Sequence, residues 1–438
     1  MKPHLLITLS QEDVAPLRPH WQDLLVKSSL AERVNDLLPS IDFALNAHDI
    51  SVWATCEYSS SQKTWTSEEL RSGLHRIYRL VLQRNQVIPE SLINAIALLP
   101  EVKSVRIGAV GQSVLPEPLF QTASIRTNRH SREMIQLSAA HQITQGLPEI
   151  KIAVLDTGIQ VAHPELVDAM LPGYDFVDIL NGANRFLGDY LGADPDPDDE
   201  VGHGTHVAGI IAAQGKAIPI GVAPKCRLIP VRVLGAMRQG KHRVGAGLVD
   251  NINNGIKWAI DQGAHIINMS LGIQHSGGGL PHEEVIRYAQ AKGIIIVAAA
   301  GNDGQENRYY PGALPGVIAV GALDAQGKIA SFSTYGRQVV IAAPGTEIYS
   351  TYINNSYAFS SGTSQAAPFV SGAIALLQSR ALAISGRYLT NAQINHVLKH
   401  TADKLNRHFR HSRAGFGALN LKDALRLLDH RLQSYMTG

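Results

Sequence analysis

The 438-residue sequence predicts a three-layer α/β/α domain with a mostly parallel sheet, preceded by a small α+β domain. Three observations support this prediction. From residue 150 onward, short apolar runs that suit buried strands alternate with longer helical patterns. Apolar residues make up 45% of the chain and charged residues 17%, which is enough to fill a large core. The length exceeds that of one average domain and favours a second, smaller unit.

Changes in pattern along the chain divide it into three zones. Residues 1–110 mix strand-like and helix-like segments and are expected to form an N-terminal α+β domain. Residues 111–149 contain Pro116, Pro118 and several arginines, so they are expected to be a linker that leads into a helix near residues 131–145. Residues 150–430 carry the strand and helix alternation of the large domain.

Both domains have individually predictable elements. In the small domain, residues 4–9 and 102–107 are expected to be strands, and residues 91–99 a helix ending at Pro100. Thr66-Ser67-Glu68-Glu69 matches a capping box, which predicts a helix with one apolar face. That face is Leu70, Leu74, Ile77, Leu80 and Val81. In the large domain the expected strands are residues 151–155, 227–234, 266–271, 294–300, 317–322 and 339–342. A helical stripe over residues 248–260 is expected to stop at Gly263.

Charge, cysteines and hydropathy limit the classes of protein. A net charge of +2 gives no support for a nucleic-acid or membrane partner. Two cysteines, Cys56 and Cys226, exclude a dense disulfide framework and are expected to be free thiols. The apolar run at the N-terminus is too short for a signal peptide, and no stretch is expected to span a bilayer. These features predict a cytoplasmic protein.

Two polar residues stand where predicted buried strands end, the usual place for ligands in open α/β sheets. Asp156 directly follows the apolar run at residues 152–155, although a lone aspartate there is more often a turn residue. Asn302 follows residues 298–301, and its amide suits a turn or a hydrogen bond to an oxyanion.

A histidine and a serine stand at the start of two predicted apolar helices. His203 lies in Gly202-His203-Gly204-Thr205-His206, where a buried structural histidine is the plainer interpretation. The spacing of His203 and His206 is three, and not the four of a helical zinc motif. Ser364 lies in Ser361-Gly362-Thr363-Ser364-Gln365, where the helix dipole would favour a developing oxyanion, but an ordinary capping serine is common.

Taken together, these residues lie in three long sequence blocks. The blocks are Leu155-Asp156-Thr157-Gly158-Ile159, Gly202-His203-Gly204-Thr205-His206-Val207-Ala208-Gly209 and Ser361-Gly362-Thr363-Ser364. They resemble the signature blocks of the subtilisin-like serine proteases (subtilases, peptidase family S8), and the order Asp, His, Ser is that of subtilisin. Shorter blocks agree, among them Ala299-Ala300-Gly301-Asn302 and Ala343-Pro344-Gly345.

The resemblance implies a serine endopeptidase that acts on peptide or protein substrates. In it Ser364 would be the nucleophile, His203 the base and Asp156 the residue that orients the base. Asn302 would bind the oxyanion, and His206 would be a structural neighbour. The resemblance also places Ser270, Leu271 and Gly272 along one side of the bound peptide and Ala299, Ala300 and Gly301 along its specificity pocket. Their small size implies a pocket open to sizeable side chains.

The resemblance implies no cofactor for the chemistry. The acidic run at residues 194–200 is expected to be a solvated loop, although it leaves a structural calcium open. Two features depart from the family pattern. Gln365 stands where the family usually has methionine, and residues 236–247 hold an extra basic segment that should border the cleft.

Residues 91–96 and 100–105 resemble the end of a subtilase propeptide. Residues 1–110 are therefore expected to be a folding chaperone and intramolecular inhibitor, with a permanent partner-recognition domain as the alternative. Two other functions stay open for the large domain. One is a peptide ligase or macrocyclase that uses the same acyl-enzyme, and the other is a non-catalytic peptide-binding protein.

Overall fold

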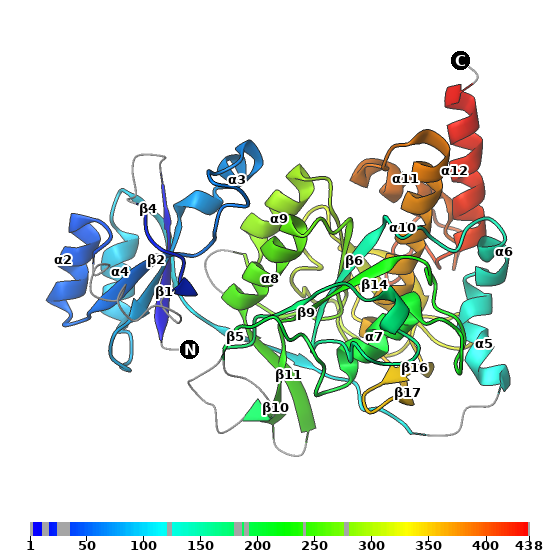
Figure 1. The fold of residues 1–438 in the computed structure, drawn as a ribbon, viewed down its shortest axis with the longest axis horizontal. Coiled ribbons are helices and arrows are strands. Elements are labelled where there is room, and N and C mark those ends of the chain that lie inside the picture. Colours follow the sequence, from blue (N-terminus) through cyan, green and yellow to red (C-terminus); the bar gives the residue numbers. More distant parts are fainter. Residues whose placement is uncertain are drawn as a thin grey trace.

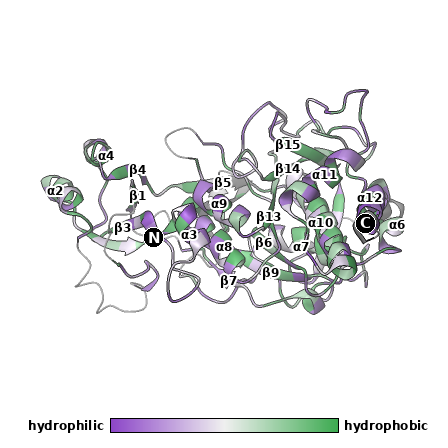
Figure 2. Cartoon of the chain, turned by 90° about the horizontal axis from the view of Figure 1, so that it is seen from above, coloured by the Kyte–Doolittle hydropathy of each residue, from purple (hydrophilic) through white to green (hydrophobic). Residues whose placement is uncertain are grey.

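The computed structural model describes residues 3–10, 17–23, 36–120, 125–178, 186–187, 192–239, 242–275 and 280–436. Figure 1 shows a small blue N-terminal part beside a larger part that holds the rest of the chain. In Figure 2 the same two parts lie end to end along the long axis of the molecule.

The small part is one antiparallel sheet in the order β2-β3-β1-β4. Its strands are β1 (His4–Leu9), β2 (Val52–Cys56), β3 (Ile77–Leu82) and β4 (Val102–Ile107). Helices α2 (Pro39–Ala47) and α4 (Glu90–Ala97) share an apolar core with the sheet. The predicted strands at residues 4–9 and 102–107 and the predicted helix near residues 91–99 are confirmed.

One predicted helix in this part is wrong. The capping box at Thr66 is present, but α3 (Ser67–Ser72) ends at Gly73, which has a φ of 79°. A single 3₁₀ turn, η2 (Leu74–Arg76), follows, and Ile77–Leu82 is then strand β3 in the middle of the sheet. Because five of the six residues of β3 are buried, the strand shows no polar alternation, and its apolar spacing fits a helix equally well.

The large part is built on a seven-stranded sheet whose neighbouring strands all run parallel. The order is β15-β14-β13-β12-β6-β9-β7. The strands are β6 (Lys151–Asp156), β7 (Tyr174–Asp175), β9 (Arg227–Arg232), β12 (Ile266–Met269), β13 (Ile295–Ala299), β14 (Ile318–Leu323) and β15 (Val339–Pro344). All six predicted strands of this domain are present, with ends that shift by one or two residues.

Helices cover both faces of this sheet, which confirms the predicted three layers. Ile152 and Val154 of β6 share a core with α7 (His203–Ala212), α10 (Thr363–Ser385), α11 (Asn391–Thr401) and α12 (Leu421–Met436). Ala153 and Leu155 point to the other face and pack with α8 (Val249–Asp261) and α9 (Glu283–Ala291). The 2-residue period of the strand thus separates two apolar cores.

The chain between the two parts contributes to the large one. β5 (Val110–Val114) pairs with β11 (His242–Leu248), which forms a hairpin with β10 (Gly235–Gln239), and β8 (Phe186–Leu187) pairs with β10. The extra basic segment is therefore this hairpin. The remaining elements are η3 (Val167–Ala169) and the hairpin of β16 (Ile348–Tyr352) and β17 (Ser356–Ser360).

The helix predicted at residues 131–145 is two helices. α5 (Ile125–Met134) and α6 (Leu137–His141) are separated by Gln136, whose φ of 56° breaks the helical path. Cys56 and Cys226 are free thiols, as expected.

Within the described residues, α10 is the one helix that is long and apolar enough to cross a membrane. About four-fifths of its most apolar window, 78%, is buried inside the protein, and it packs against α7, α12 and five strands of the parallel sheet. Its apolar composition is accounted for by its place in the core.

The small sheet packs against α8 through a largely buried cluster of charges, here called the interface cluster: Glu57, Arg79, Arg106 and Asp250. Arg79 and Glu57 form a bidentate ion pair with both N–O distances at 2.6 Å, and both side chains are fully buried. Arg106 lies 2.5 Å from Asp250 of α8. Asn254 of α8 donates to Glu57 at 2.6 Å. Polar side chains from both parts of the chain thus satisfy one another at the contact.

Candidate active site

An aspartate and a histidine meet at the carboxyl end of β6, an interior strand of the large sheet. Asp156 is the last residue of β6, and His203 is the first residue of α7. His203 Nδ1 lies 2.6 Å from Asp156 Oδ1, and the Thr157 amide donates to the same oxygen at 2.7 Å. Because an ionised carboxylate only accepts hydrogen bonds, this contact assigns the proton to Nδ1 and leaves Nε2 as the basic nitrogen.

Local sequence explains why the two side chains come so close. A Cβ atom at Gly204 would lie 2.0 Å from the Gly158 carbonyl oxygen, so only glycine lets α7 approach the turn after β6. Asp199 fixes the residues before α7: its carboxylate accepts from the Gly202 amide at 2.9 Å and the Thr205 hydroxyl at 2.7 Å.

The electrostatics of the pair favour a basic imidazole. Burial lowers the pKa of His203, but the charge of Asp156 and its hydrogen bond outweigh burial, so the pKa lies above the usual value of 6.5. His206, one turn further, differs. Burial lowers its pKa to about 3, and Nε2 contacts the carbonyl oxygens of Ile348 at 3.0 Å and Ala358 at 3.1 Å. His206 is therefore a neutral residue that joins α7 to the β16–β17 hairpin.

Ser364 lies in the first turn of α10, where backbone amides have no intrahelical acceptor. Its hydroxyl donates to the Ser270 carbonyl oxygen at 3.0 Å, and the Ser270 hydroxyl donates to the Ser364 carbonyl oxygen at 2.7 Å. In the described part of the chain, His203 Nε2 has no hydrogen-bond partner. Transfer of a proton from Ser364 to His203 thus requires rotation of the serine hydroxyl away from Ser270.

Asn302 follows β13 and is held by its oxygen. Its Oδ1 accepts from the Thr363 amide at 2.8 Å and from the Thr363 hydroxyl at 2.9 Å. Because Oδ1 is fixed in this way, the exposed amide group presents Nδ2 as a donor beside the start of α10.

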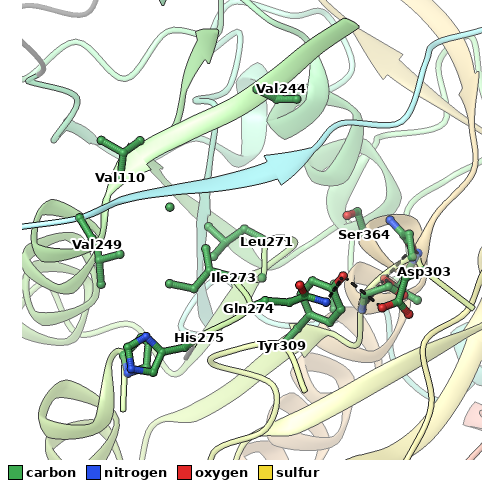
Figure 3. A pocket seen from close by; sticks show the side chains of 18 of the residues that line it. Val110, Val244, Val249, Leu271, Ile273, Gln274, His275, Asp303, Tyr309 and Ser364 are labelled. Carbon is green, nitrogen blue, oxygen red and sulfur yellow. Dashed lines mark hydrogen bonds between the residues drawn. The ribbon is translucent and has the colours of Figure 1, made fainter. Parts of the chain in front are cut away.

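The two predicted peptide-binding strips follow β12 and β13, which are neighbours in the sheet. Leu271, Gly272, Ala299 and Gly301 line a cavity of about 790 Å³ that also exposes Ser364 and Asn302. Figure 3 shows Ser364 at one end of this cavity and Leu271 and Ile273 at its centre. Two members of the strips, Ser270 and Ala300, are not among the residues that line it, and Ser270 instead holds the backbone of Ser364.

The segment after β4 crosses this cleft, which the sequence did not indicate. β5 pairs antiparallel with β11, with Gly111 opposite Gly247 and Val114 opposite Val244. Figure 3 shows β5, in cyan, passing over the cavity between β11 and Leu271. Leu115 and Pro116 then line a second cavity with His203, and Leu119 pairs with Phe359 of β17. The chain therefore enters the cleft at Val110, at the end away from Ser364 (Figure 3), and runs extended toward His203.

The acidic side chains of residues 194–200 do not gather into one group. Among the residues that the structure describes, no three or more His, Cys, Asp or Glu side chains form a group that could hold a metal ion. Instead, Asp199 organises the turn before α7, and Glu200 lies 3.3 Å from Arg232.

Comparisons with known proteins agree with the fold. The model of the subtilase family matches residues 148–417. The thermophilic serine proteinase of Bacillus sp. (strain AK1) is 42% identical over 269 residues, which are 61% of this chain and 60% of that protein. Thermitase of Thermoactinomyces vulgaris is 39% identical over 282 residues, 64% of this chain and 90% of that one.

Two solved structures resemble the chain. The prenylagaramide maturation protease PagA has a TM-score of 0.54 and 32% identity, covering 67% of this chain and 98% of its own. A protease from Pseudoalteromonas arctica has a TM-score of 0.60 and 30% identity, covering 69% of this chain and 97% of its own. The protein is therefore a serine endopeptidase, a hydrolase of peptide bonds. It belongs to the subtilase family.

Proposed function

We propose that the enzyme hydrolyses peptide bonds through an acyl-enzyme on Ser364. The observation that carries this proposal is the buried contact of 2.6 Å between Asp156 and His203, together with a serine in the first turn of α10, a helix that packs against the helix of His203. His203 Nε2 takes the hydroxyl proton as Ser364 Oγ bonds to the scissile carbonyl carbon, and passes that proton to the leaving amine as the C–N bond breaks. Water then hydrolyses the ester by the same route.

Charge develops on the carbonyl oxygen in both steps. Nδ2 of Asn302 and the Ser364 amide at the positive end of α10 would stabilise this oxyanion. Asp156 would keep the proton on Nδ1 and stabilise the imidazolium. No cofactor has a role in these steps.

We further propose that residues 1–110, together with the segment of residues 110–119 that crosses the cleft, form an intramolecular inhibitor. Three features support it: the extended path of β5 over the cavity, the pairing of Leu119 with Phe359, and the interface cluster that fastens the small sheet to α8. A peptide that lies in the cleft by strand pairing excludes other substrates. Activation then requires cleavage of this segment and release of the small domain.

Fluorophosphonate labelling with intact-mass measurement tests both proposals. We expect the purified wild type to lose its N-terminal part by cleavage at a bond within the linker of residues 111–149, and the released large domain to take up one label. Ser364→Ala is the matched control, because it lacks only the nucleophile; it should remain at full length and stay unlabelled.

Other results would contradict one proposal or the other. Labelling of an uncut, fully active chain would exclude the inhibitor. Absence of labelling in both the uncut and cut forms would exclude the nucleophile and favour a peptide-binding role. Products that lack the mass of one added water would support a ligase.

A pH profile tests the role of the Asp156–His203 pair. The base must be neutral, so we expect kcat/KM to rise with pH through a pKa above that of an ordinary histidine. Asp156→Asn removes the charge that raises this pKa, so the acid limb should move to lower pH. It should also lower kcat by about 10⁴, the effect of the same change in another Ser-His-Asp protease. An acid limb that stays in place would show that Asp156 does not set the basicity of His203.

A further inference from the structure

The cavity beside Ser364 is closed on one side by a tyrosine that the family resemblance did not single out. Tyr309 lines this cavity together with Gly272, Gly301 and Ser364. Figure 3 shows its ring between Gln274 and Asp303, near Ser364. It belongs to the loop after β13 and not to either of the two strips expected to bind peptide.

The ring lies against the backbone of both strips. A Cβ atom at Gly301 would lie 2.4 Å from Cδ2 of Tyr309, and one at Gly272 would lie 3.1 Å from its Cβ atom. Any larger residue at position 301 would therefore collide with the ring. Gly272 and Gly301 leave space between the two walls of the expected specificity pocket, and the ring of Tyr309 fills that space.

The ring is held in this position by its hydroxyl. Gln274 Nε2 donates to Tyr309 Oη at 3.1 Å, and Tyr309 Oη lies 3.3 Å from Asp303 Oδ2. Asp303 is itself fixed, since its Oδ1 accepts from the Gln305 amide at 3.0 Å and also from the Thr334 hydroxyl. A ring anchored at both ends does not swing out of the pocket without loss of these bonds.

We infer that Tyr309 restricts the residue before the scissile bond (P1) to small side chains such as glycine, alanine and serine. This inference rests on the proposed peptidase function of Ser364. A P1 aromatic or leucine would need the volume that the ring already fills, and overfilling a close-packed site is unfavourable. The expectation of an open pocket took account of the small residues of the two strips, but not of the side chain that lies between them.

The test is the ratio of kcat/KM for two peptides that differ only at P1, alanine against phenylalanine. For the activated wild type we expect alanine to be favoured by at least about tenfold, since pocket size discriminates by roughly 10- to 200-fold. Tyr309→Gly should reverse this preference. Tyr309→Phe keeps the ring but not its hydroxyl bonds, so it should retain the preference for alanine.

The outcomes separate this inference from the function on which it rests. A wild type that labels with fluorophosphonate and prefers P1 phenylalanine would overturn the role of Tyr309 and leave the peptidase proposal standing. A wild type that neither labels nor cleaves either peptide would overturn the function itself. If Tyr309→Gly does not fold, the wild-type ratio alone decides.

Discussion

His203→Ala is expected to lower kcat by about a millionfold, because the serine hydroxyl then has no base within reach. The size is that found in subtilisin, a member of the same family, for loss of the histidine or the serine alone. The residual rate should come from binding and from the oxyanion donors. The measurement is kcat on a peptide substrate with enzyme whose N-terminal part has been removed.

The double variant His203→Ala/Ser364→Ala makes the test stricter. When two residues act in the same step, removal of either one already abolishes that step. The double variant should therefore be no slower than either single variant. His408→Ala is a suitable control, since this exposed histidine lies in a C-terminal loop away from the site. If the effects of the two changes multiplied, His203 and Ser364 would not share one step.

Arg79→Met is expected to destabilise the full-length chain by about 3–5 kcal/mol, the usual effect of removing one partner of a buried ion pair. Arg79 and Glu57 are both fully buried, and Arg79 also donates to Asn251 of α8 at 3.1 Å. Urea unfolding on a Ser364→Ala background, which keeps the chain uncut, measures the effect. Arg71→Met, at an arginine with a side chain 70% exposed in the same part, should change stability by less than about 0.5 kcal/mol.

The pH dependence of this variant identifies the cause. Burial raises the pKa of Glu57 to about 7, and the charge of Arg79 opposes that rise. Without Arg79 the folded-state pKa rises further. The folded protein then binds a proton that the unfolded chain lacks, so stability should fall with rising pH by up to about 1.4 kcal/mol per unit, and should continue to fall above pH 7. A pH-independent loss would point to packing alone.

Much of the catalytic fold could be predicted from local sequence. Residues 151–155 and the other five apolar runs lie in a parallel sheet covered on both faces, so each is a short continuous apolar stretch, which is a strong signal. Asp156 and Asn302 could be placed because each follows such a run directly. The structure brings the aspartate of the first sequence block and the histidine of the second into contact, with 2.6 Å between Asp156 Oδ1 and His203 Nδ1.

What could not be predicted depends on contacts between distant segments. β3 carries an apolar spacing that fits a helix, and only its pairing with β1 and β2 decides for a strand. β5 has no apolar pattern of its own and becomes a strand because β11 offers it an edge. Tyr309 gave no signal, because its role depends on the space left at Gly272 and Gly301.

The position of Ser364 at the start of α10 has a consequence for how the enzyme loses activity. α10 runs for 23 residues through the larger of the two apolar cores, so the proposed nucleophile belongs to the part of the protein that opens last. Amide hydrogens in the middle of α10 should exchange with solvent only through global unfolding. Heat or denaturant should therefore abolish activity in the same cooperative transition that unfolds the large domain, without an earlier phase of local fraying at the nucleophile.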